Sequence, residues 1–234
     1  MSGRTSLKPP KEDITDKALA IGKAILGDIV PLGGTFAELA GQFIRTPYQK
    51  RVEEWQEQVG EALHRLAIEQ KVRLEDLQED PKFVDTVLHA TQIALRNANE
   101  EKRAALRNAI VNSGLPSAPD ESQRQMFLNY IDSFTPWHLR LLALFNDPTG
   151  WFRAHGKPWP NIYMGARAHI LEAAYPEAKQ EEAFFRQVWR DLHTSGLVAT
   201  DSLSGMMSEN RIKQAVTTAT GGQFLRFINE PPTG

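Results

Sequence analysis

The sequence predicts a mainly α-helical protein with a small α+β domain at its C-terminal end. Apolar residues recur at helical spacing along most of the chain, helix-start signals recur between these runs, and strand-like segments appear only after Gly196. With 234 residues, of which 41% are hydrophobic and 24% charged, the chain can bury a sizeable core. The formal net charge of −2 gives no overall attraction to nucleic acid or anionic lipid.

The chain contains no cysteine, which excludes disulfides, thiolate catalysis and cysteine-bound zinc. Residues 1–13 are polar, contain two prolines and lack the apolar core of a signal peptide, so a flexible leader is predicted there. From Ile14 to Ile29, apolar residues follow at steps of three and four, which predicts an amphipathic helix. Pro31, Gly33 and Gly34 then break it.

A second helix is predicted to start at Thr35, because Glu38 completes a capping box, so the two helices form an apolar hairpin. The longest charge-free run of the opening region, Ile29 to Ala37, is far shorter than the ~20 residues of a spanning helix. The favoured hypothesis is that the hairpin packs on the next helix; the alternative is that it engages a membrane or a protein partner after release. The candidate residues for that contact are Ile25, Leu26, Ile29, Leu32, Phe36, Leu39 and Phe43.

A long third helix is predicted to start at Thr46 and Pro47, with a heptad-like apolar seam from Tyr48 to Leu66. An acidic connector, RLEDLQEDPKF, leads to a helix that begins at Asp80 and Pro81 and ends near Asn97. Another helix covers NEEKRAALRNAIVNSG. Residues 14–115 are therefore predicted to form a helical hairpin and a long-helix bundle, which the break LPSAPD separates from a domain over 120–230.

Residues 120–230 are predicted to form a winged-helix-like domain. Asp120 caps a first helix, Thr135 and Pro136 start TPWHLRLLALFND, and PTGWFRAHGKPWP reads as a loop. Helices are predicted over NIYMGARAHILEAAYP and EEAFFRQVWRDLHTSG. A short strand LVAT, a polar loop from Asp201 to Gln214, strand-like AVTTAT and a closing helix GGQFLRFI complete the order that is typical of a winged helix.

Motifs for catalysis, cofactors or metal are absent from the sequence. The six histidines lack metal-binding spacing, and there is no phosphate-cradling glycine motif and no nucleophile elbow. We therefore expect a protein that is not an enzyme, with no cofactor, no metal and no small-molecule substrate. The segment WFRAHGKPWP mixes aromatic residues with Arg153, His155 and Lys157, which can stack on and pair with nucleotides, although such loops more often cover a domain core.

DNA binding is the alternative function that a winged helix suggests. The presumed recognition helix, Glu181 to Ser195, carries two basic and three acidic residues, a net charge of −1, so nucleic-acid binding is disfavoured. In this alternative the protein is a winged-helix transcriptional regulator. Its candidate contacts are Arg186, Arg190, Arg211 and Lys213.

Several packing segments occur in a characteristic order: GGTFAEL, TPYQKRVEEWQEQVGEAL, DPKF, ALRNANEEKRAALRNAIVNS, MFLNYIDSFTPWHLRLLALF and the winged-helix-like tail. From about Asp13 onward, this order resembles the bacterial abortive-infection alpha family. The resemblance brings no catalytic residue. It implies a cytoplasmic protein in or near phage defence that acts through a protein partner or self-association, with peripheral membrane contact on activation as an alternative.

Overall fold

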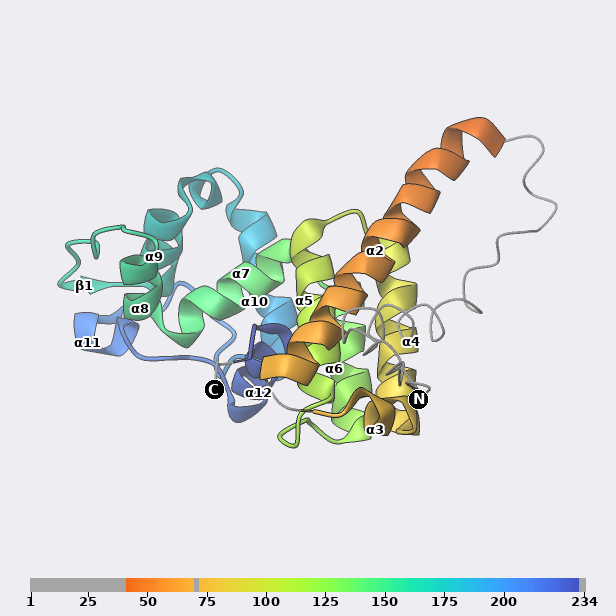
Figure 1. The fold of residues 1–234 in the computed structure, drawn as a ribbon. Coiled ribbons are helices and arrows are strands. Elements are labelled where there is room, and N and C mark those ends of the chain that lie inside the picture. Colours follow the sequence, from red (N-terminus) through yellow and green to blue (C-terminus); the bar gives the residue numbers. More distant parts are fainter. Residues whose placement is uncertain (1–40, 70–71, 232–234) are drawn as a thin grey trace, which may run out of the picture. The chain divides into compact units, whose positions relative to one another are not determined.

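A computed structural model describes the backbone of residues 41–69 and 72–231, and the side chains from Tyr48 onward within these ranges (Figure 1). These residues are mainly helical, as predicted. The leader over 1–13 and most of the hairpin lie outside the described residues, as do its candidate contact residues Ile25, Leu26, Ile29, Leu32, Phe36 and Leu39, and the side chain of Phe43.

The chain divides into two compact units. Unit 1 takes in the described parts of Met1–Ala98 together with Leu106–Ala118, and unit 2 takes in Asn99–Ala105 and Pro119–Pro231. Helix α5 (Glu100–Ser113) therefore contributes its first residues to unit 2 and the rest to unit 1.

Unit 1 is built around one long helix, α2 (Gly41–Glu69), which packs along α4 (Pro81–Arg96) (Figure 1). The heptad-like seam is buried from Val52 to Leu66, and the indole Nε1 of Trp55 donates a hydrogen bond of 3.0 Å to Thr91 of α4. The seam of α2 thus packs within its own chain.

Two local predictions in unit 1 are wrong. Helix α2 continues through Pro47 instead of starting there. The acidic connector contains a short helix, α3 (Leu74–Gln78), because Leu74 and Leu77 are both buried. The start of α4 is confirmed, since Asp80 Oδ1 accepts a hydrogen bond of 3.0 Å from the amide of Lys82.

Unit 2 is a helical unit with an aromatic core. Phe127, Phe145, Trp189, Phe224 and Phe227 are all buried in it. Helix α7 packs against α10 and α12. Its helices are α6 (Glu121–Ser133), α7 (Pro136–Asn146), α8 (Pro148–Ala154), α9 (Arg167–Ala174), α10 (Glu182–Thr194), α11 (Glu209–Ile212) and α12 (Ala219–Ile228), with a 3-10 helix η2 (Pro176–Lys179).

The loop predicted over PTGWFRAHGKPWP is partly wrong, because α8 occupies its first half. Asp147 caps α8 by accepting a hydrogen bond of 2.9 Å from Gly150, and Pro148 is its first residue. The helix predicted over NIYMGARAHILEAAYP is also too long, since α9 begins only at Arg167. The end of α10 is confirmed, because Gly196 follows it with a φ of 70°.

The strands of unit 2 are very short. β1 (Met164–Gly165) pairs antiparallel with β2 (Met207–Ser208), and Val198 and Thr217 form an isolated bridge where the strands LVAT and AVTTAT were predicted. The prediction of a polar loop over 201–214 is wrong, because this segment contains β2 and α11. A winged-helix fold for residues 120–230 therefore stays a prediction.

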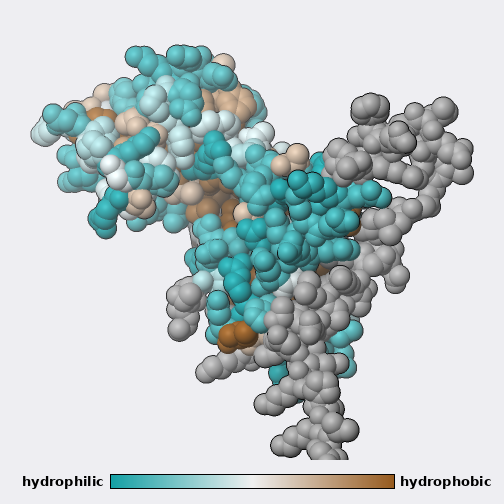
Figure 2. Space-filling model, turned by 45° about the horizontal axis from the view of Figure 1, so that its top comes forward, coloured by the Kyte–Doolittle hydropathy of each residue, from teal (hydrophilic) through white to brown (hydrophobic). Residues whose placement is uncertain are grey.

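The surface is predominantly hydrophilic in the view of Figure 2, where hydrophobic residues of the described part appear in small separate groups. Large apolar side chains that are exposed include Ile68, Tyr163, Met164, Phe184 and Met206. In the part of the chain that the structure describes, no helix is both long enough and apolar enough to cross a bilayer.

Candidate functional site

A pocket of about 580 Å³ opens in unit 2 beside helices α7 and α8 and the junction of α9 with η2. We call it the aromatic pocket. Its walls are formed chiefly by Glu101, Arg140, Trp151, His155, Lys157 and Tyr175, with Ala143 and Glu177 also lining it. A concave, mainly apolar site with a few polar groups is the usual form of a binding site.

The aromatic wall comes from α8 and the end of α9. Trp151 and His155 lie one helical turn apart on α8, and their rings are stacked with centroids 3.8 Å apart. Tyr175 also packs on this pair, with its ring centroid 5.2 Å from that of Trp151 and the two rings tilted by 57°. His155 also bonds to the carbonyl of Trp151 through Nδ1, at 2.8 Å, which fixes its ring. The wall is therefore a preformed block of three rings.

The two cations of the pocket both have partners. Arg140 Nε donates to the two carboxylate oxygens of Glu101, at 3.1 and 2.9 Å, and Nη2 donates to the same carboxylate. These bonds raise the pKa of Arg140 above its usual value. Lys157 Nζ donates to the carbonyl of Ala174 at 2.5 Å and lies 5.7 Å from the ring centroid of Trp151. The charges hold the walls in place.

The hydroxyl of Tyr175 stays protonated at neutral pH. Burial raises its pKa above the ordinary value, against the opposing effect of the nearby Arg140 charge. The phenol therefore offers a neutral donor beside the rings. The pocket therefore combines aromatic rings, one phenol hydroxyl and charges that are already paired. Such a lining suits an apolar or aromatic group.

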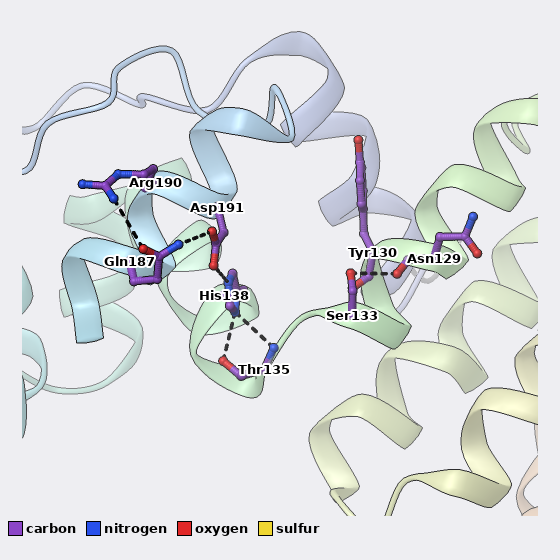
Figure 3. A network of polar contacts seen from close by, with 8 residues as sticks. All are labelled: Asn129, Tyr130, Ser133, Thr135, His138, Gln187, Arg190 and Asp191. Carbon is purple, nitrogen blue, oxygen red and sulfur yellow. Dashed lines mark hydrogen bonds and ion pairs between the residues drawn. The ribbon is translucent and has the colours of Figure 1, made fainter. Parts of the chain in front are cut away.

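A second cluster of unit 2 has the appearance of a nucleophile, a base and an acid. Figure 3 shows His138 between Thr135 and Asp191. The His138 ring is 2.9 Å from the Thr135 hydroxyl through Nδ1 and 3.3 Å from Asp191 Oδ2 through Nε2. The side chain of His138 is buried.

The role of this cluster follows from its backbone bond. The amide of Thr135 donates to Nδ1 of His138 at 3.1 Å, which occupies the one lone pair of that nitrogen and leaves Nε2 to donate to Asp191. Burial lowers the pKa of His138, so the ring is neutral at neutral pH. The cluster caps helix α7 and joins it to α10. His169 makes the same bond, at 3.0 Å, to the amide that precedes α9.

The four basic residues predicted as nucleic-acid contacts do not line the aromatic pocket. On α10, Arg186 pairs with Glu182 at 3.4 Å and Arg190 bonds weakly to Gln187 at 3.5 Å. On and beside α11, Lys213 pairs with Glu209 at 2.6 Å. Arg211 lies in a different hollow of unit 2.

Sequence reasoning identified only part of the aromatic pocket. His155 and Lys157 stood in the aromatic-basic segment noted above, together with Trp151. Arg140, Glu101 and Tyr175 were missed because they come from three other elements. A weak signal for Tyr175 was its place directly before Pro176, where a helix normally ends.

The described residues contain no group of three or more histidine, aspartate and glutamate side chains arranged to hold a metal ion. Comparison with known protein families, curated proteins and solved structures found no match to this chain.

Proposed function

We propose that this chain is a non-enzymatic interaction protein and that the aromatic pocket receives an apolar or aromatic side chain of a protein partner. The observation that carries the proposal is the composition of the walls. Trp151, Tyr175 and Arg140 belong to the three residue types that most often dominate binding energy at protein interfaces.

The charges of the pocket explain why the anchor is an uncharged side chain. Arg140 is neutralised by Glu101, and Lys157 already donates to a backbone carbonyl. A charged ligand would have to compete with these bonds, whereas an uncharged aromatic or apolar group can pack against the wall of rings without breaking any of them. A polar rim with an apolar centre is also the usual anatomy of an interface.

The wider setting of this interaction is part of the same proposal. The resemblance to the abortive-infection alpha family supports a role in phage defence in the bacterial cytoplasm, with a protein partner or a second copy as the bound molecule. Membrane engagement by the N-terminal hairpin would be a later step, and its residues lie outside those described. The winged-helix regulator remains the alternative, although the ion pairs of Arg186 and Lys213 weaken it.

The test uses a random peptide library displayed on a surface and selected on the immobilised full-length protein. Ala143 lines the pocket and is exposed, so Ala143→Trp should fill the pocket without removing a wall. Ala183 is an exposed alanine on α10 outside the pocket, which makes Ala183→Trp the matched control.

We expect peptides with an aromatic or large apolar anchor to be enriched on the wild type and on Ala183→Trp. Binding to Ala143→Trp should fall at least about tenfold, which corresponds to about 1.4 kcal/mol. Equal binding to both variants, or no enrichment at all, would overturn the proposed pocket. Plaque counts on bacteria that express these variants test the defence role separately.

A further inference from the structure

A second hollow of unit 2 contains a buried arginine with no counter-charge. Arg167 is the first residue of α9, and the residue as a whole is only 8% exposed. Within the described residues, its guanidinium has neither an ion pair nor a hydrogen bond. Arginine is rarely buried without a partner, because removing the charge from water costs free energy that nothing then offsets.

A second arginine lines the same hollow. Burial lowers the pKa of Arg167 below the usual value, and the charge of Arg211 on α11 lowers it further. Glu209 does not neutralise the pair, since it is engaged with Lys213 at 2.6 Å. An arginine side chain carries a positive charge in proteins, so the hollow holds two positive charges that repel each other.

The hollow, which we call the arginine pocket, has a volume of about 380 Å³. One wall is the segment from Ala199 to Gly205, which hydrogen bonds to other elements hold in place. The carbonyl of Leu203 accepts a hydrogen bond of 2.9 Å from the amide of Ala168, and the carbonyl of Thr200 accepts one of 2.9 Å from the indole Nε1 of Trp189. The walls are therefore positioned before any ligand arrives.

A neighbouring wall, Gln214 to Thr217, is fixed in the same way. The amide of Val216 donates a hydrogen bond of 3.0 Å to the carbonyl of Phe145. The carbonyl of Val216 accepts one of 2.9 Å from the amide of Ala199. Preorganised walls lower the entropic cost of binding a small ligand.

Hydroxyl groups add further donors to this pocket. The hydroxyl oxygen of Thr200 accepts a hydrogen bond of 3.4 Å from the amide of Ser202, and the hydroxyl oxygen of Ser202 accepts one of 3.1 Å from the amide of Ser204. Each hydroxyl keeps its hydrogen for another acceptor. Both residues line the arginine pocket, so two hydroxyl hydrogens accompany the two guanidinium groups.

We propose that the arginine pocket binds the terminal phosphate of a small phosphorylated molecule. A phosphate monoester carries nearly two negative charges and three terminal oxygens, which match two separate guanidinium groups and two hydroxyl donors. A carboxylate, with one charge and two oxygens, would leave part of this donor set unused. This site is independent of the proposed partner pocket, because the two hollows share no lining residue.

A terminal phosphate fits the pocket better than a nucleic-acid backbone. Arg167 is a largely buried residue that lines the hollow, and a backbone phosphodiester carries a sugar on both sides. The exposed arginine of α10 that a duplex would also need, Arg186, is engaged with Glu182. Nucleic acid is therefore an outcome that the test must distinguish.

The first experiment measures thermal melting of the full-length protein with inorganic phosphate, an aliphatic phosphate monoester and a nucleoside monophosphate. Chloride at matched ionic strength is the control for screening. At ten times the dissociation constant, the melting temperature should rise by about 3–6 °C. If inorganic phosphate alone accounts for the whole shift, the ligand is free phosphate; a larger shift with one ester identifies the attached group.

Variants locate the binding. Arg167→Met and Arg211→Met should each abolish the phosphate-dependent shift, and Arg211 is exposed, so its variant keeps the test valid if Arg167→Met fails to fold. Arg186→Met removes one exposed positive charge outside the pocket and should retain the shift.

Two results would overturn the proposal. One is a phosphate-dependent shift that is equal in the wild type, Arg167→Met and Arg211→Met, or absent from all of them. The other is binding of duplex DNA that is tighter than binding of any monoester and that is lost in Arg186→Met as well as in Arg211→Met. That second result would favour the winged-helix regulator instead.

Discussion

The two pockets of unit 2 differ in whether their arginine side chain has a counter-charge. In the aromatic pocket, the Arg140 side chain is 35% exposed and is held by the carboxylate of Glu101. In the arginine pocket, Arg167 is 8% exposed and faces a second arginine. Folding alone would favour the reverse arrangement, because an unpaired charge is least costly where water can reach it.

The difference separates structural charges from charges that are available for a ligand. The Arg140–Glu101 pair fixes a wall of the aromatic pocket and leaves the recognition surface to rings. In the described structure, the side chains of Arg167 and Arg211 make no hydrogen bond or ion pair and so retain their donors for a ligand. The fold tolerates this cost, and binding of an anion would offset it.

The largest expected effect comes from removing the unpaired charge. In phosphate-free buffer, Arg167→Met should raise the free energy of unfolding by about 1–2 kcal/mol, since methionine fills similar space without a buried charge. Urea denaturation measures the change. The matched variant Arg186→Met should change stability by less than about 0.5 kcal/mol. A loss of stability in Arg167→Met would show that this guanidinium has a stabilising partner after all.

Removing a paired charge from the aromatic pocket should lower the free energy of unfolding instead of raising it, and by a smaller amount. Glu101→Gln leaves Arg140 without its carboxylate and should lower the free energy of unfolding by about 0.5–1 kcal/mol. The loss should shrink at high salt, because the pair is partly exposed. Glu182→Gln, which breaks the exposed pair with Arg186, is the control and should cost only about 0.3 kcal/mol. Equal effects of the two variants would contradict the structural role of Glu101.

The smallest expected effect is on the pH dependence of stability and concerns His138, a buried histidine that is hydrogen-bonded to Thr135 and Asp191. Burial lowers its folded pKa below the unfolded value of about 6.5, so the unfolded chain takes up the proton first as pH falls. The His138 contribution is therefore fully present above that value and is lost as pH falls through it towards the folded pKa. Denaturation at about pH 7.5 and about pH 5.5 should show a smaller stability loss in His138→Gln than in the wild type. The same loss in both proteins would assign the pH dependence to other groups.

The sequence by itself determined where several of the described helices begin, because helix starts depend on neighbouring residues. An acceptor side chain followed by proline sets the start of α4 at Asp80 and Pro81, and of α7 at Thr135 and Pro136. The same local chemistry operates at Asp147 and Pro148, where the surrounding glycines and prolines concealed it. The buried seam of α2 also followed from apolar spacing alone.

Only the tertiary structure decided which side chains share a pocket. Arg167 and Arg211 stand on different helices far apart in the chain, and neither has a neighbour in sequence that marks it as unpaired. The aromatic pocket likewise draws on α5, α7, α8 and η2. Strands of two residues are too short to leave an alternating pattern, so β1 and β2 were also invisible. Periodicity reports which face of an element is apolar, whereas the meeting of two charges depends on how the chain packs.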